Sequence, residues 1–205
     1  MALLHQATLH PTKLELLADW LPGRDWHTGP AGEVTRVAAF RFDDPANKVG
    51  IDTMLVRVGD GPIHHVPLTY REAPLTGADE WLLGTAEHSV LGKRWVYDAP
   101  GDPVYAAALA SAILGNTGQA EQFVDVDGRL ERREPTMTIA SNTTENVPAV
   151  GAIQRVVTGD PTLIVTDTVE LAVVRRLGAD LTGAVLTATW PGETTSTALA
   201  SATRR

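Results

Sequence analysis

The stretch that decides the fold is residues 49–70, VGIDTMLVRVGDGPIHHVPLTY. Two runs rich in apolar and β-branched residues flank the tetrapeptide Gly59-Asp60-Gly61-Pro62, and this order predicts a strand, a tight turn and a second strand. Glycine permits positive φ where the chain reverses, and Pro62 cannot donate a hydrogen bond to a ladder. The sequence therefore predicts an antiparallel hairpin that turns at residues 59–62.

Side chains alternate between the two faces of a strand, so each run presents two candidate core faces. In each run one face ends in three apolar residues, and we expect that face to pack into the core. The expected core faces are Asp52, Met54, Val56 and Val58 in the first run, and His64, Val66, Leu68 and Tyr70 in the second.

The segment before the hairpin adds a helix and a strand. Residues 34–42, VTRVAAFRF, have strand composition and end at an Asp-Asp-Pro turn, which predicts a three-stranded antiparallel meander. Residues 11–21 predict a helix that starts with Pro11 in its first position and carries leucines at helical spacing. Pro22 and Gly23 are expected to end that helix.

A second helix is predicted at residues 102–115. Asp102 is a good N-cap residue, Pro103 suits the first helical position, and Gly115 can terminate the helix. Its many alanines favour close packing against a sheet.

Most of the remaining chain is predicted to be β-structure. Residues 123–126 and 129–132 flank Asp127-Gly128, which is a strong signal for a tight hairpin turn. Further strands are expected at residues 81–89, 93–98, 136–140, 153–157, 162–166, 169–175 and 184–190. The fold class is therefore α+β, with a curved antiparallel sheet, two or more helices packed on it and additional C-terminal strands. We expect one domain at residues 1–192 and a flexible tail, rich in Ser, Thr and Ala, at residues 193–205.

The composition excludes several classes of function. The chain has 205 residues, a net charge of −8 and no cysteine, which rules out disulfides and thiolate chemistry. An acidic chain is a poor partner for nucleic acid, whose phosphates attract clustered Lys and Arg. The dense basic cluster of Arg129, Arg132 and Arg133 is interleaved with Glu131 and Glu134, which is typical of a solvated strand face. We find neither a long apolar run nor a signal peptide, and expect a cytoplasmic protein.

The motifs of metal, nucleotide and nucleophile chemistry are absent from the sequence. The six histidines have no HExxH or similar spacing, and there is no GxGxxG, P-loop or GxSxG pattern. We therefore expect no catalytic residue, no metal and no cofactor. The five tryptophans could stack on sugars, although scattered tryptophans are more typical of core anchors.

One segment combines both charge signs, a histidine and two aromatic residues within a dozen positions. The candidate surface for a ligand or partner consists of Arg71, Glu87, His88, Lys93, Arg94, Trp95, Tyr97 and Asp98. The alternative is that Trp95 and Tyr97 belong to the core and that Lys93 and Arg94 only decorate a turn. Strand alternation places Glu87 and Ser89 opposite His88, which argues against a Ser–His catalytic pair.

Four segments resemble the N-terminal cap domain of maltokinase-like sugar kinases, in particular the cap-like proteins of actinobacteria. They are DWLPGRDWHTG at 19–29, FRFDDPANKVGIDTMLV at 40–56, VPLTYREAPL at 66–75, and GTAEHSVLGKRWVYD at 84–98, which continues to Asp102-Pro103-Val104. The resemblance implies a cystatin-like cap that precedes a two-lobed kinase body. It implies no catalytic residue in this chain, because the ATP-binding lysine and the catalytic aspartate lie in the kinase lobes. The sequence differs from kinase caps at Trp26-His27-Thr28-Gly29, so no role is carried over for that loop.

Two hypotheses about function follow. The first is a stand-alone, non-catalytic cap-like module that is accessory or regulatory to a sugar kinase or another enzyme of glucan, trehalose or amino-sugar metabolism. The second is a protein that binds a sugar or sugar phosphate, or a modest enzyme, with its site on the concave face of the sheet. Both allow a homo-oligomer, and neither requires nucleic acid or a membrane.

Overall fold

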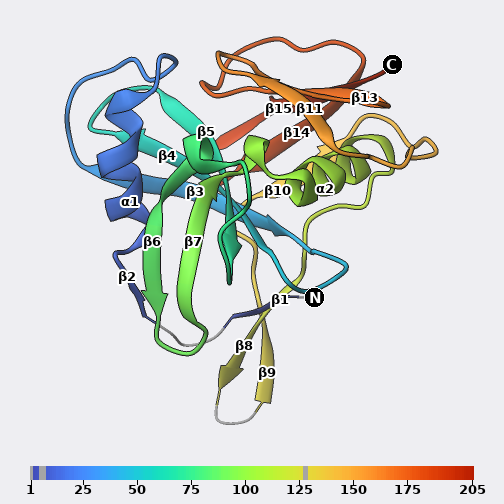
Figure 1. Ribbon diagram of the computed structural model, residues 1–205. Helices are drawn as coiled ribbons and strands as arrows, with labels where there is room; N and C mark the ends of the chain where they lie inside the picture. The colour runs from blue at the N-terminus through green and yellow to red at the C-terminus, as the bar shows by residue number, and fades with distance from the viewer. Residues whose placement is uncertain (1, 5–7, 127–128) are drawn as a thin grey trace.

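The computed structural model describes residues 2–4, 8–126 and 129–205. Within these residues the chain forms two α-helices, two six-stranded antiparallel sheets and a three-stranded sheet (Figure 1). The helices are α1 (Lys13–Trp20) and α2 (Pro103–Leu114). The predicted α+β class with a curved antiparallel sheet is confirmed. Neither helix of this described part has the length and hydropathy needed to span a bilayer.

The first six-stranded sheet, here called the N-terminal sheet, contains the predicted meander. Its strand order is β2-β6-β7-β5-β4-β3. The strands are β2 (Leu9–His10), β3 (Val34–Phe42), β4 (Gly50–Val58), β5 (Ile63–Arg71), β6 (Leu82–His88) and β7 (Gly92–Asp98). Consecutive strands β3, β4 and β5 pair antiparallel as predicted. Gly59 has φ of 51°, the left-handed conformation that the tight turn requires.

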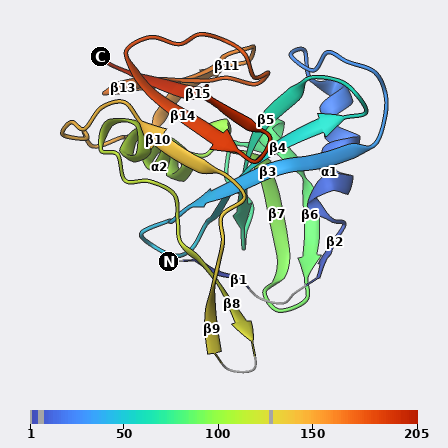
Figure 2. The ribbon, with the colours of Figure 1, turned by 180° about the vertical axis from the view of Figure 1, so that it is seen from behind.

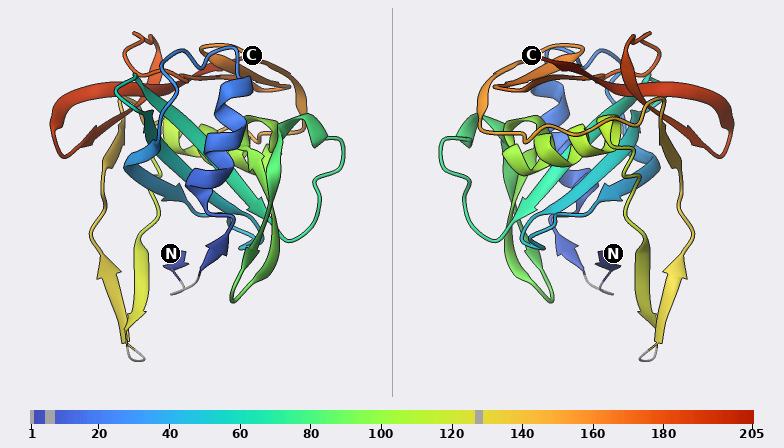
Figure 3. Two further views of the ribbon diagram at one scale, coloured as in Figure 1. Left: turned by 90° about the vertical axis from the view of Figure 1, so that its left-hand side faces the viewer. Right: turned by 90° about the vertical axis from the view of Figure 1, so that its right-hand side faces the viewer.

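Helix α1 lies in the hollow of the N-terminal sheet. It contacts both β3 and β6, which are far apart in the strand order, because the sheet curls around the helix (Figure 3). Leu16, Leu17 and Trp20 of the helix pack against the predicted core face of the hairpin. The members of that face in this core are Met54, Val56, Val58, Val66 and Leu68. We call this side of the sheet the concave face.

The opposite, convex face of the hairpin is also buried. Ile51 and Leu55 are both 0% exposed and belong to a second core with α2 and the C-terminal strands. The expectation of a single core face is therefore wrong. The two strands are covered on both sides, which explains why most residues of β4 and β5 are buried, including six consecutive residues in each strand.

The two helices differ in how well the sequence predicts their starts. Helix α2 begins at Pro103 after the Asp102 N-cap, whose side chain accepts a hydrogen bond from the Val104 N–H, as predicted. Helix α1 begins at Lys13, not at Pro11. Its N-cap is Thr12, which forms a reciprocal capping box with Glu15. The Glu15 carboxylate accepts the N–H of Thr12, and this hydrogen bond lowers the pKa of Glu15.

The second six-stranded sheet, here called the C-terminal sheet, has the order β10-β14-β15-β13-β12-β11. Its strands are β10 (Thr138–Ser141), β11 (Ile153–Val157), β12 (Thr162–Thr166), β13 (Val169–Val173), β14 (Ala184–Trp190) and β15 (Glu193–Arg204). The predicted flexible tail is wrong, because residues 193–204 form β15, an inner strand paired with β13 and β14. Leu199 and Ala200 of this strand are 0% exposed.

The third sheet forms an arm that extends away from the two larger sheets (Figures 1 and 2). Strand β8 (Gln122–Val126) pairs in parallel with β1 (Ala2–Leu4) and antiparallel with β9 (Arg129–Arg133). The predicted hairpin pairing is confirmed, and its turn, Asp127-Gly128, lies outside the described residues. All five residues of β9 are exposed, which agrees with the predicted solvated strand face.

The two large sheets are joined by main-chain hydrogen bonds at the start of β5. The N–H of His65 donates to the carbonyl of Arg175 over 2.8 Å, and the N–H of Leu177 donates to the carbonyl of Ile63 over 3.0 Å. Helix α2 packs between the sheets and contributes Tyr105, Leu109 and Ile113 to the convex-side core. We call this junction the seam.

Candidate functional site

The candidate surface predicted from the sequence divides into an inner and an outer part. Tyr97 and Asp98, at the end of β7, are 1% and 3% exposed. Glu87 and Lys93 lie opposite each other on β6 and β7 near the free end of that hairpin, and both are exposed. Along the seven residues of β7 the environment changes from exposed at its start to buried at its end. The residues therefore do not form one site.

Asp98 binds the buried guanidinium of Arg175 at the seam. Two hydrogen bonds join them, Nη1 to Oδ1 at 2.8 Å and Nη2 to Oδ2 at 2.6 Å. Arg175 is 1% exposed, its Nε donates to the Thr162 hydroxyl over 2.8 Å, and its guanidinium lies 4.9 Å from the ring of Trp26. A buried, bidentate pair of this kind fixes the position of two elements rather than presenting groups to a ligand. Asp98 is a structural residue.

Arg71 also forms a structural ion pair. Its Nε and Nη2 each donate to a different oxygen of Asp102 over 2.7 Å. The same carboxylate caps helix α2 through the Val104 N–H, so Arg71 anchors the end of β5 to the start of that helix. Its hydrogen bonds to the Asp102 carboxylate raise the pKa of Arg71. The sequence does not reveal this ion pair, because Asp102 is 31 positions from Arg71, so Arg71 is grouped with the candidate surface.

Tyr97 holds the loop that follows β5. Its ring is buried and its hydroxyl accepts a hydrogen bond from the N–H of Leu75 over 2.9 Å. The alternative that Tyr97 belongs to the core is therefore correct. Trp95 shares its strand face but is only partly buried, with the ammonium of Lys93 5.0 Å above its ring.

The outer part is the tip of the β6–β7 hairpin. His88 holds its turn, since its Nδ1 accepts hydrogen bonds from the N–H groups of Val90 at 3.2 Å and Leu91 at 3.1 Å. Val90 and Leu91 are 57% and 47% exposed, the largest pair of adjacent exposed apolar side chains among the described residues. Sequence reasoning missed these two residues, although two apolar residues at a predicted turn between polar neighbours are a signal of partner contact.

We define the hairpin tip as residues 87–94. It combines the exposed apolar pair with Glu87 on one strand and Lys93 and Arg94 on the other. A centre of exposed apolar side chains with a rim of both charge signs is the composition of a protein-binding patch. It is a poor catalytic centre, because Ser89 accepts the N–H of Thr8 with its hydroxyl and His88 is used within the turn.

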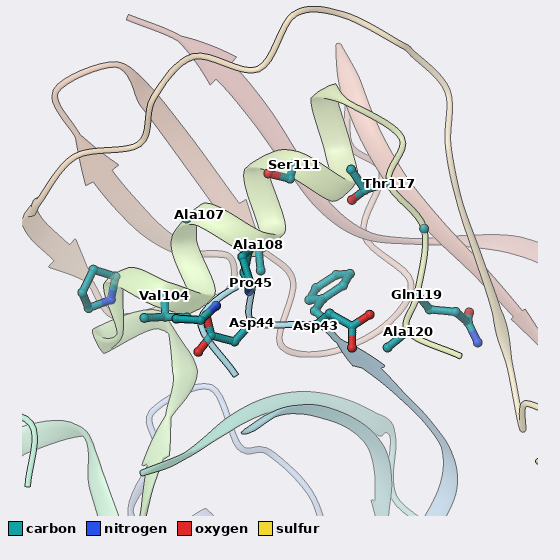
Figure 4. Close-up of a pocket in the computed structure, with 14 residues that line it drawn as sticks. Asp43, Asp44, Pro45, Val104, Ala107, Ala108, Ser111, Thr117, Gln119 and Ala120 are labelled. Carbon is teal, nitrogen blue, oxygen red and sulfur yellow. The ribbon is translucent and has the colours of Figure 1, made fainter. Parts of the chain in front are cut away.

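A cavity lies elsewhere, beside helix α2 (Figure 4). Its volume is about 580 Å³, which is within the range of small-molecule sites. The lining comes from the turn after β3, the outer side of α2 and the segment before β8. The lining residues that Figure 4 labels are Asp43, Asp44, Pro45, Val104, Ala107, Ala108, Ser111, Thr117, Gln119 and Ala120.

The polar groups of this cavity are largely used by the protein itself. The Asp44 carboxylate accepts the N–H groups of Ala46, Lys48 and Val49, and these bonds outweigh the effect of burial and lower its pKa. The amide of Gln119 bonds the main chain at Met137 and Ile139. Few groups remain to orient a ligand, so the cavity does not define a substrate class.

Two buried histidines at the seam have strongly shifted pKa values. Burial lowers the pKa of both His64 and His65 to about 4, and the neighbouring His27 contributes to the shift at His64. The Nδ1 of His65 lies 2.8 Å from the carbonyl of Val174, and the Nε2 of His64 lies 3.1 Å from the Nδ1 of His27. In the described part of the chain, no group of three or more His, Asp or Glu side chains could hold a metal ion.

Comparison with known protein families identifies the segment that forms most of the N-terminal sheet. Residues 20–102 match the maltokinase N-terminal cap domain family. The resemblance drawn from the sequence is thereby confirmed for this segment, which we call the cap-like segment. It runs from the last residue of α1 through β7 to the N-cap of α2, and covers less than half of the chain. No curated protein matches the chain.

The match places the features described above relative to the family. The hairpin tip lies inside the cap-like segment, as do both arginine-binding carboxylates, Asp98 and Asp102. Helix α2 and the whole C-terminal sheet lie outside it. The cap-like segment therefore contributes one carboxylate to the seam, and the rest of the chain contributes Arg175.

Proposed function

We propose that this chain is a non-catalytic, maltokinase-cap-like module that acts as an accessory to a sugar kinase, and that it contacts the kinase through the hairpin tip. The observation that carries the proposal is the position of Val90 and Leu91, exposed side by side inside the cap-like segment. Adjacent apolar side chains gain free energy when a partner removes them from water, and an apolar patch with a polar rim is typical of a protein-interaction site.

The hairpin is built to hold this tip in place. Strand β7 pairs with β6 on one side and with β5 on the other, and β6 also pairs with β2. The His88 ring fixes the turn, and Lys93 packs over Trp95. A tip that is ordered before binding loses little conformational entropy on association, which favours a specific interface.

The expectation of no kinase activity for this chain alone is part of the proposal. The support is the sequence, which lacks a kinase catalytic loop and a phosphate-binding glycine loop. The test is ATP-dependent phosphorylation of maltose or glucosamine by the purified chain, compared with a no-protein control. Phosphorylation above that control would overturn this part of the proposal.

The interface is tested with a sugar kinase from the same cell that co-purifies with the chain. We expect the double variant V90S/L91S to weaken that complex by more than about tenfold, because central apolar residues of an interface each contribute at least about 1 kcal/mol. The matched control is V157S/L130S, which removes two exposed apolar side chains from β11 and β9 instead. Equal affinities for wild-type and V90S/L91S would remove the hairpin tip as the contact.

The competing hypothesis places a ligand pocket on the concave face, and the structure bears on the size of that ligand. Helix α1 and the side chains of Trp20 and Trp26 pack against that face. A cavity beside Lys13 of the helix has a volume of about 90 Å³, below the range of about 300–1,000 Å³ for small-molecule pockets. A cavity of this size suits a smaller, charged group.

A further inference from the structure

A small polar cavity lies on the concave face, at the N-terminal end of helix α1. We call it the concave cavity and define it by its lining residues: Lys13, Arg36, Ala39, Arg41, Asp52, Met54, Gln122, Arg133, Glu134 and Thr136. Its volume is about 90 Å³. At roughly 30 Å³ for each water molecule in the liquid, this space suits a group of a few heavy atoms.

Three parts of the chain meet at this cavity. Arg41 and Asp52 are directly opposite each other on β3 and β4, so their side chains share the concave face. Lys13 comes from the first turn of α1 and forms an ion pair with Asp52. Arg133 and Glu134 come from the end of β9, at the base of the arm. The cap-like segment, the helix before it and the arm after it each contribute charge.

The cavity has an excess of positive charge in an acidic protein. Four cations and two carboxylates line it, whereas the whole chain has a net charge of −8. Among the ion pairs of the described residues only Lys13–Asp52 lies here, so Asp52 is neutralised and Arg36, Arg41 and Arg133 have no carboxylate in ion-pair contact. A cluster of this kind attracts an anion.

Two buried donors in this region have no partner among the described residues. They are the Nε of Arg41 and the hydroxyl of Tyr70. Tyr70 lies on β5 opposite Gly50, on the same concave side as Asp52. A Cβ at Gly50 would lie 3.4 Å from both Arg41 Nη2 and Tyr70 Cβ, so the glycine leaves room for these two side chains to approach each other. A buried donor without an acceptor costs about 1–3 kcal/mol, which an anion would offset.

We propose that the concave cavity binds a phosphate group. The two additional cations match the charge of about −1.5 to −2 that a phosphate monoester carries at neutral pH. Arginine side chains supply the forked donors that pair with phosphate oxygens, and the buried Nε of Arg41 is a donor that has no partner among the described residues. The group is either free inorganic phosphate or the phosphate of an ester whose organic part stays outside the cavity. The proposal does not depend on a kinase partner.

The experiment is a calorimetric titration of the full chain with three probes. Inorganic phosphate tests the group itself, glucose 6-phosphate tests an ester, and acetate tests whether any small anion suffices. We expect phosphate to bind and acetate to bind at least about tenfold more weakly, because acetate has fewer acceptor oxygens and less charge. Tighter binding of glucose 6-phosphate than of phosphate would identify an ester as the ligand. The reverse order would identify the free ion.

Charge variants locate the binding. The double variant R36Q/R133Q removes two cations of the cavity at exposed positions, and we expect it to raise the dissociation constant for phosphate by about tenfold or more. The matched control is R57Q/R155Q, which removes two exposed arginines of β4 and β11 outside the cavity and changes the net charge equally. We expect a change of less than about twofold for the control.

The variant R41M separates binding from folding. It removes a guanidinium of the cavity lining whose buried Nε has no hydrogen-bond partner among the described residues, so we expect an unchanged or raised Tm without phosphate and weaker binding of phosphate. Two results would overturn the proposal. One is no heat of binding with phosphate up to about 10 mM. The other is an equal loss of affinity in R36Q/R133Q and in R57Q/R155Q, which would indicate general attraction of an anion to the surface.

Discussion

The two six-stranded sheets of this protein have the same number of strands but are buried in different ways. In the N-terminal sheet, β4 and β5 are covered by α1 on the concave face and by α2 on the convex face, and most of their residues are buried. In the C-terminal sheet, buried and partly exposed residues alternate along β13, from Val169 to Val173. The first sheet is an inner layer, whereas the second is an outer layer with one face to water.

This difference explains where functional surfaces can lie. A strand buried on both faces offers only its ends and edges to a ligand or partner. The hairpin tip is such an end, at the turn between β6 and β7, and the concave cavity lies beside the edge strand β3, which contributes Arg36 and Arg41. The C-terminal sheet presents a whole face instead, and its role in the structure is to cover the convex core.

The largest effect is expected for a variant that breaks the connection between the two sheets. The variant R175M removes the buried cation at the seam and leaves the Asp98 carboxylate unpaired. We expect the free energy of unfolding to fall by about 3–5 kcal/mol, as measured by urea titration. The double variant D98L/R175M should recover a large part of this loss, because it no longer buries a charge. A loss below about 1 kcal/mol for R175M would mean that the seam does not hold the sheets together.

The next effect tests whether the last strand is part of the C-terminal sheet. Leu199 on β15 is 0% exposed and lies within the convex-side core. We expect L199A to cost about 2–5 kcal/mol, the usual range for truncation of a buried leucine. The control T195A changes an exposed residue of the same strand and should stay within about 0.5 kcal/mol of wild-type. Equal stabilities of L199A and T195A would restore the flexible tail.

A pH titration distinguishes the seam from the surface. Because burial lowers the pKa of His64 and His65 to about 4, the unfolded chain binds protons more readily than the folded protein below pH 6.5. Stability is therefore fully present above about pH 6.5, falls as the pH decreases toward about 4, and has no further contribution from these groups below that. We expect a loss of about 3 kcal/mol between pH 6.5 and 5 from the two histidines together, measured by urea titration at each pH.

Several charged groups at the seam bear on this titration. Arg175 opposes protonation of His65, and His27 and Arg176 oppose protonation of His64, whereas Asp160 favours it. The variant H65Q should reduce the slope by about half, since it removes one of two equivalent groups. The control H10Q changes an exposed histidine on β2 and should leave the slope unchanged. A wild-type slope that equals that of H65Q would exclude His65 as a cause.

The parts of the fold that sequence predicts well have local signals. The β4–β5 hairpin has its Gly-Asp-Gly-Pro turn, and α2 has Asp102 and Pro103 at its start. The capping box of α1 is equally visible in the sequence, because Thr12 and Glu15 stand three positions apart, and this local signal overrides Pro11 as the start of the helix. Each of these signals lies within about four consecutive residues and determines the structure at the same place in the chain.

The parts that sequence missed depend on distant partners. Strand β15 consists mainly of small and hydroxylated residues and is ordered because β13 and β14 pair with it on both sides. The Asp98–Arg175 pair joins residues 77 positions apart, and nothing near Asp98 in the sequence identifies its partner. The candidate surface was wrong at Tyr97 and Asp98, which are buried, because charge and aromaticity do not reveal burial. Arg71 is partly exposed and pairs with Asp102, a partner that its sequence neighbours do not identify. At the hairpin tip it stays a prediction.

The smallest expected effect tests whether the two sheets also unfold separately. Helix α1 packs only on the concave face of the N-terminal sheet, so loss of its N-cap should weaken that region first. We expect T12A to lower the free energy of unfolding by about 1 kcal/mol, the usual value for an N-cap threonine. Hydrogen exchange should then accelerate in α1 and remain at the wild-type rate in β12 and β13. Faster exchange throughout the C-terminal sheet would contradict this and would mean that the seam makes the two sheets one cooperative unit.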